Sequence, residues 1–169
     1  MPPDISLRPI QPEDEEFLCR VYASTRTEEL APVAWTEEEK SSFLRVQFAA
    51  QHRYYRESYT SSRFEVVLVD GQPAGRLYVA RWPEELRVID IALLPEFRRR
   101  GVGTALLRGL FEEAAAQGLP VRIHVERLNP ALVLYERLGF RLLEDRGVYL
   151  FLEWRAAGAP AAAVREESR

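Results

Sequence analysis

The stretch Arg98-Arg99-Arg100-Gly101-Val102-Gly103-Thr104 decides the fold predicted for this chain. It follows an apolar run over residues 88–94 and leads into a second apolar segment, so the order predicts a strand, a tight turn and a helix. Glycines let the backbone turn sharply and approach a ligand with no Cβ in the way. The first N–H groups of a helix lack internal partners, and together with the helix dipole they attract anions. With three arginines beside it, the stretch predicts a site for a phosphorylated ligand.

Two better-known phosphate loops do not fit this stretch. A nucleoside-triphosphate loop needs Gly-Lys-Ser/Thr, whereas Thr104 follows a glycine and no lysine is present there. The dinucleotide loop needs a third small residue, and that position is Leu106. The spacing that remains is Arg-x-x-Gly-x-Gly. It is moderately specific on its own, because a surface turn before an amphipathic helix can have the same pattern.

A second segment, Asn129-Pro130-Ala131-Leu132-Val133-Leu134-Tyr135-Glu136-Arg137-Leu138-Gly139-Phe140, follows another apolar strand over residues 121–125. Its pattern, Asn-x-Ala-x-x-Leu-Tyr-x-x-x-Gly-Phe, resembles the second signature of the GNAT N-acetyltransferase superfamily. The spacing Arg-x-x-Gly-x-Gly is similar to the acetyl-CoA loop of the same superfamily, and the two occur in the right order. The resemblance covers roughly residues 5–154 and is strongest over residues 87–140.

The resemblance implies a mixed α/β GNAT fold. That fold has a mostly antiparallel sheet with helices on both faces, and its fourth and fifth strands are parallel and splay apart around acetyl-CoA. The loop backbone would bind the pyrophosphate, and the backbone of the residue just before the loop would meet the acetyl-pantetheine arm. For each arginine, exposure to solvent without any ligand is about as good an interpretation as a contact with the cofactor. For Asn129, a helix cap without any contact to the cofactor is an equal alternative. The residues expected at the cofactor are Leu93, Arg98, Arg99, Arg100, Gly101, Val102, Gly103, Thr104 and Asn129.

Tyr135 is the expected catalytic acid, because a phenol near the sulfur can protonate the thiolate that leaves when an amine attacks a thioester. Its alternative is a half-buried aromatic residue of an amphipathic helix. The base is less clear, since the position that often carries it in the superfamily is Arg87. Asp90 lies in an apolar strand, and His124 lies on the next strand with a side chain that titrates in the right range. Both residues are candidates for the general base, and His124 is slightly favoured. A purely structural role is the alternative for each.

Composition sets the remaining expectations. The 169 residues suit one domain, expected over residues 1–155, with a disordered Ala- and charge-rich tail over 156–169. A net charge of −3 gives no overall case for nucleic acid, and no apolar run is long enough to span a membrane. Cys19 is the only cysteine, so nothing argues for secretion and the cytoplasm is expected. No metal is expected, and a homodimer stays open.

The periodicity predicts an alternation of strands and helices along the whole chain. Thr36 and Glu39 form a capping box that should start a long helix, whereas residues 26–34 should be a loop. Strands are expected over residues 5–8, 64–69, 74–80, 87–94, 121–126, 140–143 and 148–154, and helices over 12–24, 36–59, 101–117 and 130–138.

The sequence favours an acetyl-CoA-dependent N-acetyltransferase that acts on a primary amine. The acceptor is a small amine, an amino acid or a peptide N-terminus, and the first helices and last hairpin should build its pocket. A catalytically silent acyl-CoA-binding module is the main alternative, favoured by Arg87 at the usual base position. A protein for another phosphorylated ligand is a weaker one. Aromatic residues that could line the acceptor pocket are Trp35, His52, Tyr54, Tyr55, Tyr59, Trp82 and Tyr149.

Overall fold

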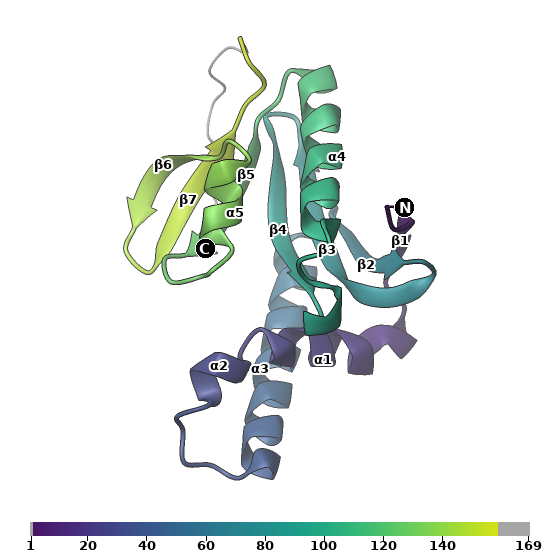
Figure 1. Cartoon of the computed structure of the whole chain (residues 1–169), viewed down its shortest axis with the longest axis vertical. Coiled ribbons are helices and arrows are strands. Elements are labelled where there is room, and N and C mark those ends of the chain that lie inside the picture. Colours follow the sequence, from purple (N-terminus) through teal and green to yellow (C-terminus); the bar gives the residue numbers. More distant parts are fainter. Residues whose placement is uncertain (1, 159–169) are drawn as a thin grey trace. The chain divides into compact units, whose positions relative to one another are not determined.

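The computed structural model describes residues 2–158, so most of the expected tail over 156–169 lies outside the described residues. Figure 1 labels the strands and helices in chain order. The elements are β1 (Ile5–Pro9), η1 (Pro12–Asp14), α1 (Glu15–Ser24), α2 (Thr27–Leu30), α3 (Glu37–Ser58), β2 (Arg63–Val69), β3 (Gln72–Trp82), β4 (Glu85–Leu93), η2 (Pro95–Phe97), α4 (Val102–Gln117), β5 (Val121–Glu126), α5 (Leu132–Arg137), β6 (Arg141–Arg146) and β7 (Tyr149–Trp154).

Seven strands form one sheet in the order β1-β2-β3-β4-β5-β7-β6. The β4–β5 pair is parallel, with Leu86 beside Val121 and Val88 beside Ile123, whereas β5 and β7 are antiparallel. The predicted mixed sheet with parallel fourth and fifth strands is therefore confirmed. The chain divides into two compact units, and β3 and β4 contribute to both. The first unit holds the residues up to Tyr78 and Asp90–Arg100, and the second holds Val79–Ile89 and the residues from Gly101 on.

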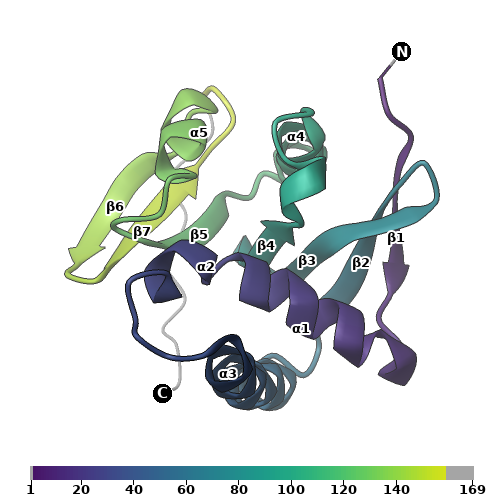
Figure 2. The same cartoon turned by 60° about the horizontal axis from the view of Figure 1, so that its bottom comes forward.

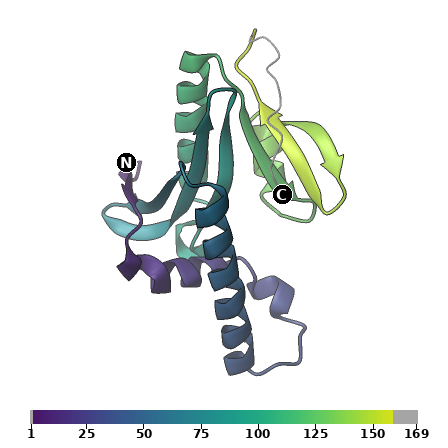
Figure 3. The same cartoon turned by 180° about the vertical axis from the view of Figure 1, so that it is seen from behind.

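The first unit is built on the antiparallel β1–β2 pair and on the contact between α1 and α3. Leu18 and Tyr22 of α1 meet Phe48 of α3 in a buried apolar cluster. The capping box predicted for α3 is present, because Thr36 accepts a hydrogen bond from the N–H of Glu39 and its own N–H donates to the Glu39 side chain. Figure 2 shows α2 near α3, and Figure 3 shows that it lies beside the N-terminal half of that helix.

Several elements differ from the sequence prediction, most of them by one or two residues at an end. The loop expected over residues 26–34 contains the short helix α2. Strand β4 begins at Glu85 instead of at residue 87, because Glu85 is buried against arginines that make a charged residue acceptable in the strand. Helix α5 begins at Leu132 instead of at residue 130, and strand β6 runs on to Arg146.

A glycine lets β3 and the end of β4 come into close contact in the first unit. A Cβ on Gly75 would lie 2.1 Å from the carbonyl oxygen of Ala92 and 2.9 Å from the Cα of Leu93. The N–H of Leu94 also donates to the carbonyl of Ala74, at 2.8 Å. Only a residue without a side chain fits at position 75, so this glycine fixes the backbone at Leu93.

The second unit packs α4 and the β5–β7–β6 strands around aromatic residues. Phe111 of α4 stacks on Trp154 of β7, with ring centroids 4.1 Å apart, and its ring also meets Phe140. Gly118 ends α4 in a left-handed conformation, as the glycine after a helix commonly does. Among residues 2–158, no helix combines the length and the apolar character needed to cross a membrane.

Candidate active site

The N-terminus of α4 carries the features of an anion site. Gly101 caps this 16-residue helix with a φ of 79°, a left-handed conformation that suits glycine. Gly101 has no side chain to cap the helix start, and the first turn holds no acidic residue. The N–H groups of this turn therefore face no side-chain acceptor or carboxylate of the helix's own cap, and the helix dipole adds to their pull on an anion. The segment Gly101–Thr104 thus fits a pyrophosphate group.

Gly103 brings the two sequence signatures together within the second unit. A Cβ at this position would meet one atom at the edge of van der Waals contact, Cδ2 of Leu134, at 4.0 Å. Leu134 lies on α5, next to Tyr135 in the second signature. The helix start predicted to hold phosphate and the helix predicted to hold the catalytic tyrosine therefore lie side by side.

The three arginines before the glycines belong to the first unit, where each has a different role. Arg98 folds back on the protein: its Nε donates to the carbonyl oxygen of Leu93 at 2.9 Å, and a terminal nitrogen donates to Ser24 Oγ at 3.3 Å. Arg100 lies over the ring of Phe97. Arg99 has a φ of 61°, which is uncommon for a residue with a side chain. The Arg98 side chain thus braces the turn after β4.

Asn129 acts as a cap in a different way from the one expected. Its side-chain oxygen accepts from the N–H of Ala131 at 2.9 Å, and Ala131 is the residue that precedes α5. Tyr135 is 5% exposed, and its ring meets Phe140 edge-on with centroids 5.7 Å apart. The aromatic contact holds the ring in one orientation beside the start of α4.

Asp90 is held on three sides by partners of its own unit. Arg76 donates to both carboxylate oxygens, at 2.9 and 3.2 Å, and the hydroxyl of Tyr55 donates to one of them at 2.9 Å. Arg76 is almost fully buried, and the Nη2 that donates to Asp90 also donates to the side-chain oxygen of Gln51 at 2.9 Å. Burial, together with the nearby Asp90, raises the pKa of the Tyr55 hydroxyl, which therefore stays protonated. Asp90 is thus the counter-ion of the buried Arg76.

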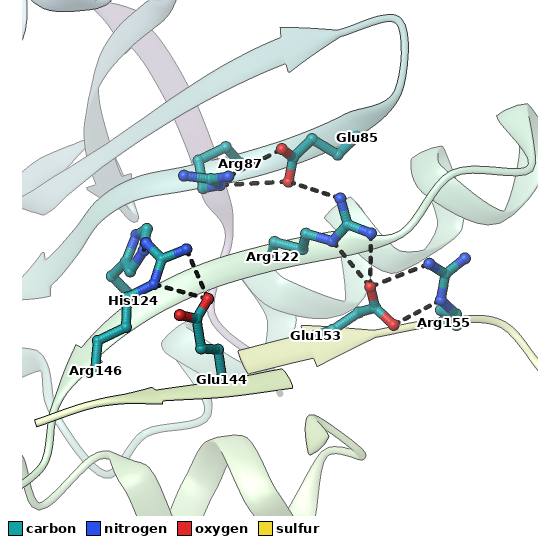
Figure 4. Close-up of polar contacts among 8 residues, drawn as sticks. All are labelled: Glu85, Arg87, Arg122, His124, Glu144, Arg146, Glu153 and Arg155. Carbon is teal, nitrogen blue, oxygen red and sulfur yellow. Dashed lines mark hydrogen bonds and ion pairs between the residues drawn. The ribbon is translucent and has the colours of Figure 1, made fainter. Parts of the chain in front are cut away.

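His124 accepts a hydrogen bond from an arginine. The Nη1 of Arg146 lies 2.8 Å from its Nε2, and because a guanidinium can only donate, Nε2 carries the lone pair and Nδ1 the proton (Figure 4). The imidazole stacks on Phe151 with centroids 4.4 Å apart, and Arg146 lies over the same ring. Glu144 accepts from Arg146 at 3.0 Å on the other side. These contacts hold the imidazole in place at the half-exposed end of β5.

Arg87, at the position where the superfamily often has its base, is turned into the protein. It is 1% exposed, donates to both oxygens of Glu85, and lies between the rings of Trp82 and Phe151. Glu85 also lies 3.5 Å from Arg122, the register neighbour of Arg87 on β5. The carboxylate next to the usual base position is therefore already neutralised by two arginines (Figure 4).

The same ion-pair chain continues through β7. Arg122 donates to Glu153 at 2.8 and 2.9 Å, and Arg155 donates to the same carboxylate (Figure 4). Burial opposes the ionisation of Glu153, but the bonds from Arg155 and Arg122 outweigh it and hold the pKa of that carboxyl below its usual range. Glu85, Arg87, Arg122, Glu153 and Arg155 thus form one buried chain of ion pairs across β4, β5 and β7, called the strand ion chain below.

Sequence reasoning missed Glu85, Glu153 and Arg146. Glu85 and Glu153 could have been found from the sequence. Charged residues two positions apart in an otherwise apolar strand, such as Glu85 and Arg87, lie on the same face and are expected to pair. Arg146 could not have been found in this way, because only the β6–β7 turn brings it to His124. That turn is itself fixed by Arg127, which binds Asp145 and the carbonyl of Gly147.

Comparison with known protein families identifies the family to which this site belongs. The family model described as "Acetyltransferase (GNAT) family" matches residues 25–140, more than half of the chain. The chain belongs to the GNAT acetyltransferase family. Its two signatures, the glycine loop and the Leu-Tyr helix, both lie in or beside that range, and proteins of this family use acetyl-CoA.

Known proteins similar to this GNAT chain agree with the assignment. A mycothiol acetyltransferase of Nocardiopsis dassonvillei is 30% identical over 110 residues, which cover 65% of this chain and 30% of that protein. The chain thus matches less than a third of that relative's length. An uncharacterized N-acetyltransferase of Escherichia coli, YafP, is 24% identical over 147 residues, covering 86% of this chain and 87% of the relative.

Solved structures show the same fold. The PaiA N-acetyltransferase of Thermoplasma acidophilum, in complex with coenzyme A, superposes with a TM-score of 0.68 at 20% identity, covering 90% of this chain and 99% of that one. An acetyltransferase of Thermus thermophilus gives a TM-score of 0.63, also at 20% identity, with 90% and 97% covered. At these identities the likeness concerns the fold, and the acceptor has to be argued from this chain's own residues.

Glu85→Gln is expected to lower the free energy of unfolding by about 3–5 kcal/mol, because Arg87 and Arg122 would stay buried without their shared carboxylate. Urea denaturation followed by circular dichroism measures the change. The control is Glu144→Gln, which removes an exposed partner of Arg146 and should cost at most about 1 kcal/mol. Equal losses in the two variants would mean that the strand ion chain contributes nothing special to stability.

Proposed function

We propose that this GNAT chain transfers the acetyl group of acetyl-CoA to a primary amine by direct attack. The observation that carries the proposal is the closeness of the uncapped start of α4 to the helix of Tyr135, since a Cβ on Gly103 would lie 4.0 Å from Cδ2 of Leu134. Both relatives named above are called acetyltransferases, which supports the reaction. We extend the proposal to one GNAT domain over residues 1–155 and to a cytoplasmic location, on composition alone.

Acetyl-CoA supplies an activated acyl group and a pyrophosphate that can anchor it. We place the pyrophosphate on the N–H groups of Gly101–Thr104, since these are the donors that α4 leaves without a side-chain cap. Among the arginines, Arg99 and Arg100 are the better phosphate candidates, because Arg98 is already bound to Leu93 and Ser24. Arg98 instead holds the Leu93 backbone that we expect along the pantetheine arm.

The reaction needs one proton removed from the amine and one supplied to the leaving sulfur. As the nitrogen bonds to the acetyl carbon, the carbon–sulfur bond breaks and the sulfur takes the electron pair. We assign the second proton to the phenol of Tyr135, whose buried ring Phe140 keeps in place. For the first proton, His124 is a better candidate than Asp90. The Nε2 of His124 accepts from Arg146, which lies on an exposed hairpin, whereas Asp90 neutralises a buried arginine.

Gly103→Asp is expected to weaken acetyl-CoA binding at least a hundredfold, about 3 kcal/mol, because a carboxylate would face the phosphates. The space around Gly103 tolerates the side chain, so the fold should survive. Isothermal titration calorimetry measures the affinity. The matched control is Gly109→Asp on the exposed side of the same helix, which should bind normally. Unchanged affinity in folded Gly103→Asp would remove the loop from the binding site.

Tyr135→Phe is expected to lower turnover about a hundredfold while acetyl-CoA affinity stays nearly unchanged, because the variant keeps the ring and loses the proton donor. Release of coenzyme A thiol, followed with a thiol reagent where chemistry limits the rate, measures turnover. Normal turnover in Tyr135→Phe would leave this tyrosine a packing residue only.

His124→Gln is expected to abolish the rise of kcat/KM with pH, because glutamine can still accept from Arg146 but cannot take a proton. His52→Gln is the control, since these are the only two histidines of the chain and burial lowers the pKa of His52. Asp90→Asn should keep the rise in whatever fraction folds. If kcat/KM still rises with pH in His124→Gln but not in Asp90→Asn, the base is Asp90 and not His124.

One assay tests the proposal as a whole. Acetyl-CoA is titrated into the protein, and thiol release is then measured against a panel of amines that includes amino acids, diamines and short peptides. Binding with thiol release for at least one amine is the expected result. Binding without release for any of them would favour an acyl-CoA-binding module, and no binding would refute the proposal.

A further inference from the structure

Arg146 is an exposed cation next to the histidine that we propose as base. Its Nη1 lies 2.8 Å from Nε2 of His124, and its Nε and Nη2 each lie 3.0 Å from one oxygen of Glu144 (Figure 4). A guanidinium carries five N–H groups, and these contacts use three of them. One N–H on each terminal nitrogen therefore meets no acceptor among residues 2–158. Two such donors on one guanidinium suit the two oxygens of a carboxylate.

The turn of the β6–β7 hairpin holds Arg146 in place. Asp145 accepts from the N–H of Gly147 at 2.9 Å, and Arg127 donates to Asp145 and to the carbonyl of Gly147. The guanidinium of Arg146 itself lies over the ring of Phe151, 4.8 Å from the ring centre. An arginine fixed in this way loses little conformational freedom when an anion binds, so it suits recognition better than a mobile surface side chain does.

The carboxylate that now contacts Arg146 is a weak competitor for a ligand. The Glu144 side chain is 57% exposed, and ion pairs of such exposed groups contribute little to stability. The next carboxylate along the strand, that of Asp145, is paired with Arg127 at the turn. A ligand carboxylate can therefore share the Arg146 guanidinium with Glu144 or take the place of Glu144.

His124 lies at the end of the second unit where α4 begins. This histidine is two residues from the end of β5, and residues 127–131 join β5 to α5. Leu134 of α5 lies near the start of α4, since a Cβ on Gly103 would be 4.0 Å from its Cδ2. An acceptor bound at this histidine is therefore in the same unit, and at the same end of it, as the start of α4 and Tyr135.

The contact between Arg146 and His124 creates a conflict for catalysis, because Nε2 is the atom that must take the amine proton. A carboxylate beside the reacting amine removes this conflict. Its charge attracts the guanidinium more strongly than an imidazole nitrogen does, and the amine then takes the place of Nη1 at Nε2. In an α-amino acid neighbouring carbon atoms carry the amine and the carboxylate, so the two groups can reach two side chains that are 2.8 Å apart.

We infer that Arg146 binds the α-carboxylate of the acceptor, and that the acceptor is a free α-amino acid. This inference rests on the proposed acetyl transfer with His124 as base. Arg146 is then a specificity-determining residue, because it selects the carboxylate and leaves Nε2 to the amine once the carboxylate is bound. A polyamine is a poor acceptor, since its other ammonium groups would meet the guanidinium, and a peptide offers an uncharged carbonyl oxygen at the matching position.

Amino acids paired with their α-amides test the inference on the full chain saturated with acetyl-CoA. The pairs cover small, apolar, aromatic, basic and acidic side chains, and thiol release gives kcat/KM for each. Every acid that reacts should exceed its amide about tenfold or more, as expected when a charged hydrogen bond is lost. The amine of an amide is less basic, which by itself favours the amide, so a preference for the acid must come from the carboxylate. Amides that react as well as their acids, or release with polyamines and peptides alone, would overturn the inference.

Three variants of β6 separate recognition from support. Arg146→Gln keeps a donor for His124 and loses the charge, so the ratio of kcat/KM between acid and amide should fall about tenfold or more. Glu144→Gln removes the competing carboxylate and should keep or raise this ratio. Arg141→Gln, at an exposed position of the same strand, is the control and should keep it. Equal losses for acid and amide in Arg146→Gln would mean that Arg146 only supports the hairpin, and would refute the assignment.

Calorimetry separates this inference from the proposed function. The protein saturated with coenzyme A is titrated with the same pairs of acids and amides. Acids that bind more tightly than their amides, with a preference that Arg146→Gln abolishes and without any thiol release, would leave the carboxylate site assigned and contradict the acetyl transfer. Thiol release with amines, combined with no preference for acids in either assay, would leave the transfer standing and refute the site. Neither binding nor release would refute both.

Discussion

Two buried arginines facing each other across parallel strands are the constraint on which the second unit depends. Arg87 on β4 and Arg122 on β5 are register neighbours with almost no contact with solvent, so their like charges must be balanced inside the protein. Glu85 binds both, and Glu153 binds Arg122 from β7. A sheet with β5 shifted by one residue would turn Arg122 to the other face and break this balance. The ion pairs therefore specify the register of three strands at once.

The position of His124 follows from the same constraint. His124 lies two residues after Arg122 on β5 and faces Phe151, its register neighbour on β7. Phe151 in turn carries the guanidinium of Arg87 on its ring. Arg87, at the position where the family often has its base, thus helps to support His124, which we propose as the base. Arg87, which looked from the sequence like a reason to doubt catalysis, has a structural role in the strand ion chain.

The sequence was sufficient for the features that depend on local backbone chemistry. The glycines at 101 and 103 predicted the start of α4, and the capping box at Thr36 predicted the start of α3. It was insufficient where a contact joins residues far apart. Asp90 with Arg76, and His124 with Arg146, are 14 and 22 residues apart, and strand alternation gives the face of a residue but not its partner. The short helix α2 was missed because four residues have too little periodicity to detect.

The cations of the strand ion chain are all guanidinium groups, and this has a chemical consequence. Lys40 is the only lysine of the chain, and its ammonium lies 3.8 Å from Glu37 with little exposure. A guanidinium stays protonated at any physiological pH and is no nucleophile toward a thioester, whereas the amine of a lysine is. A protein that keeps acetyl-CoA bound exposes its own side chains to a reactive acyl donor. With arginine at the strand ion chain, at Arg76 and at Arg146, the charges that hold this fold together cannot be lost to self-acetylation.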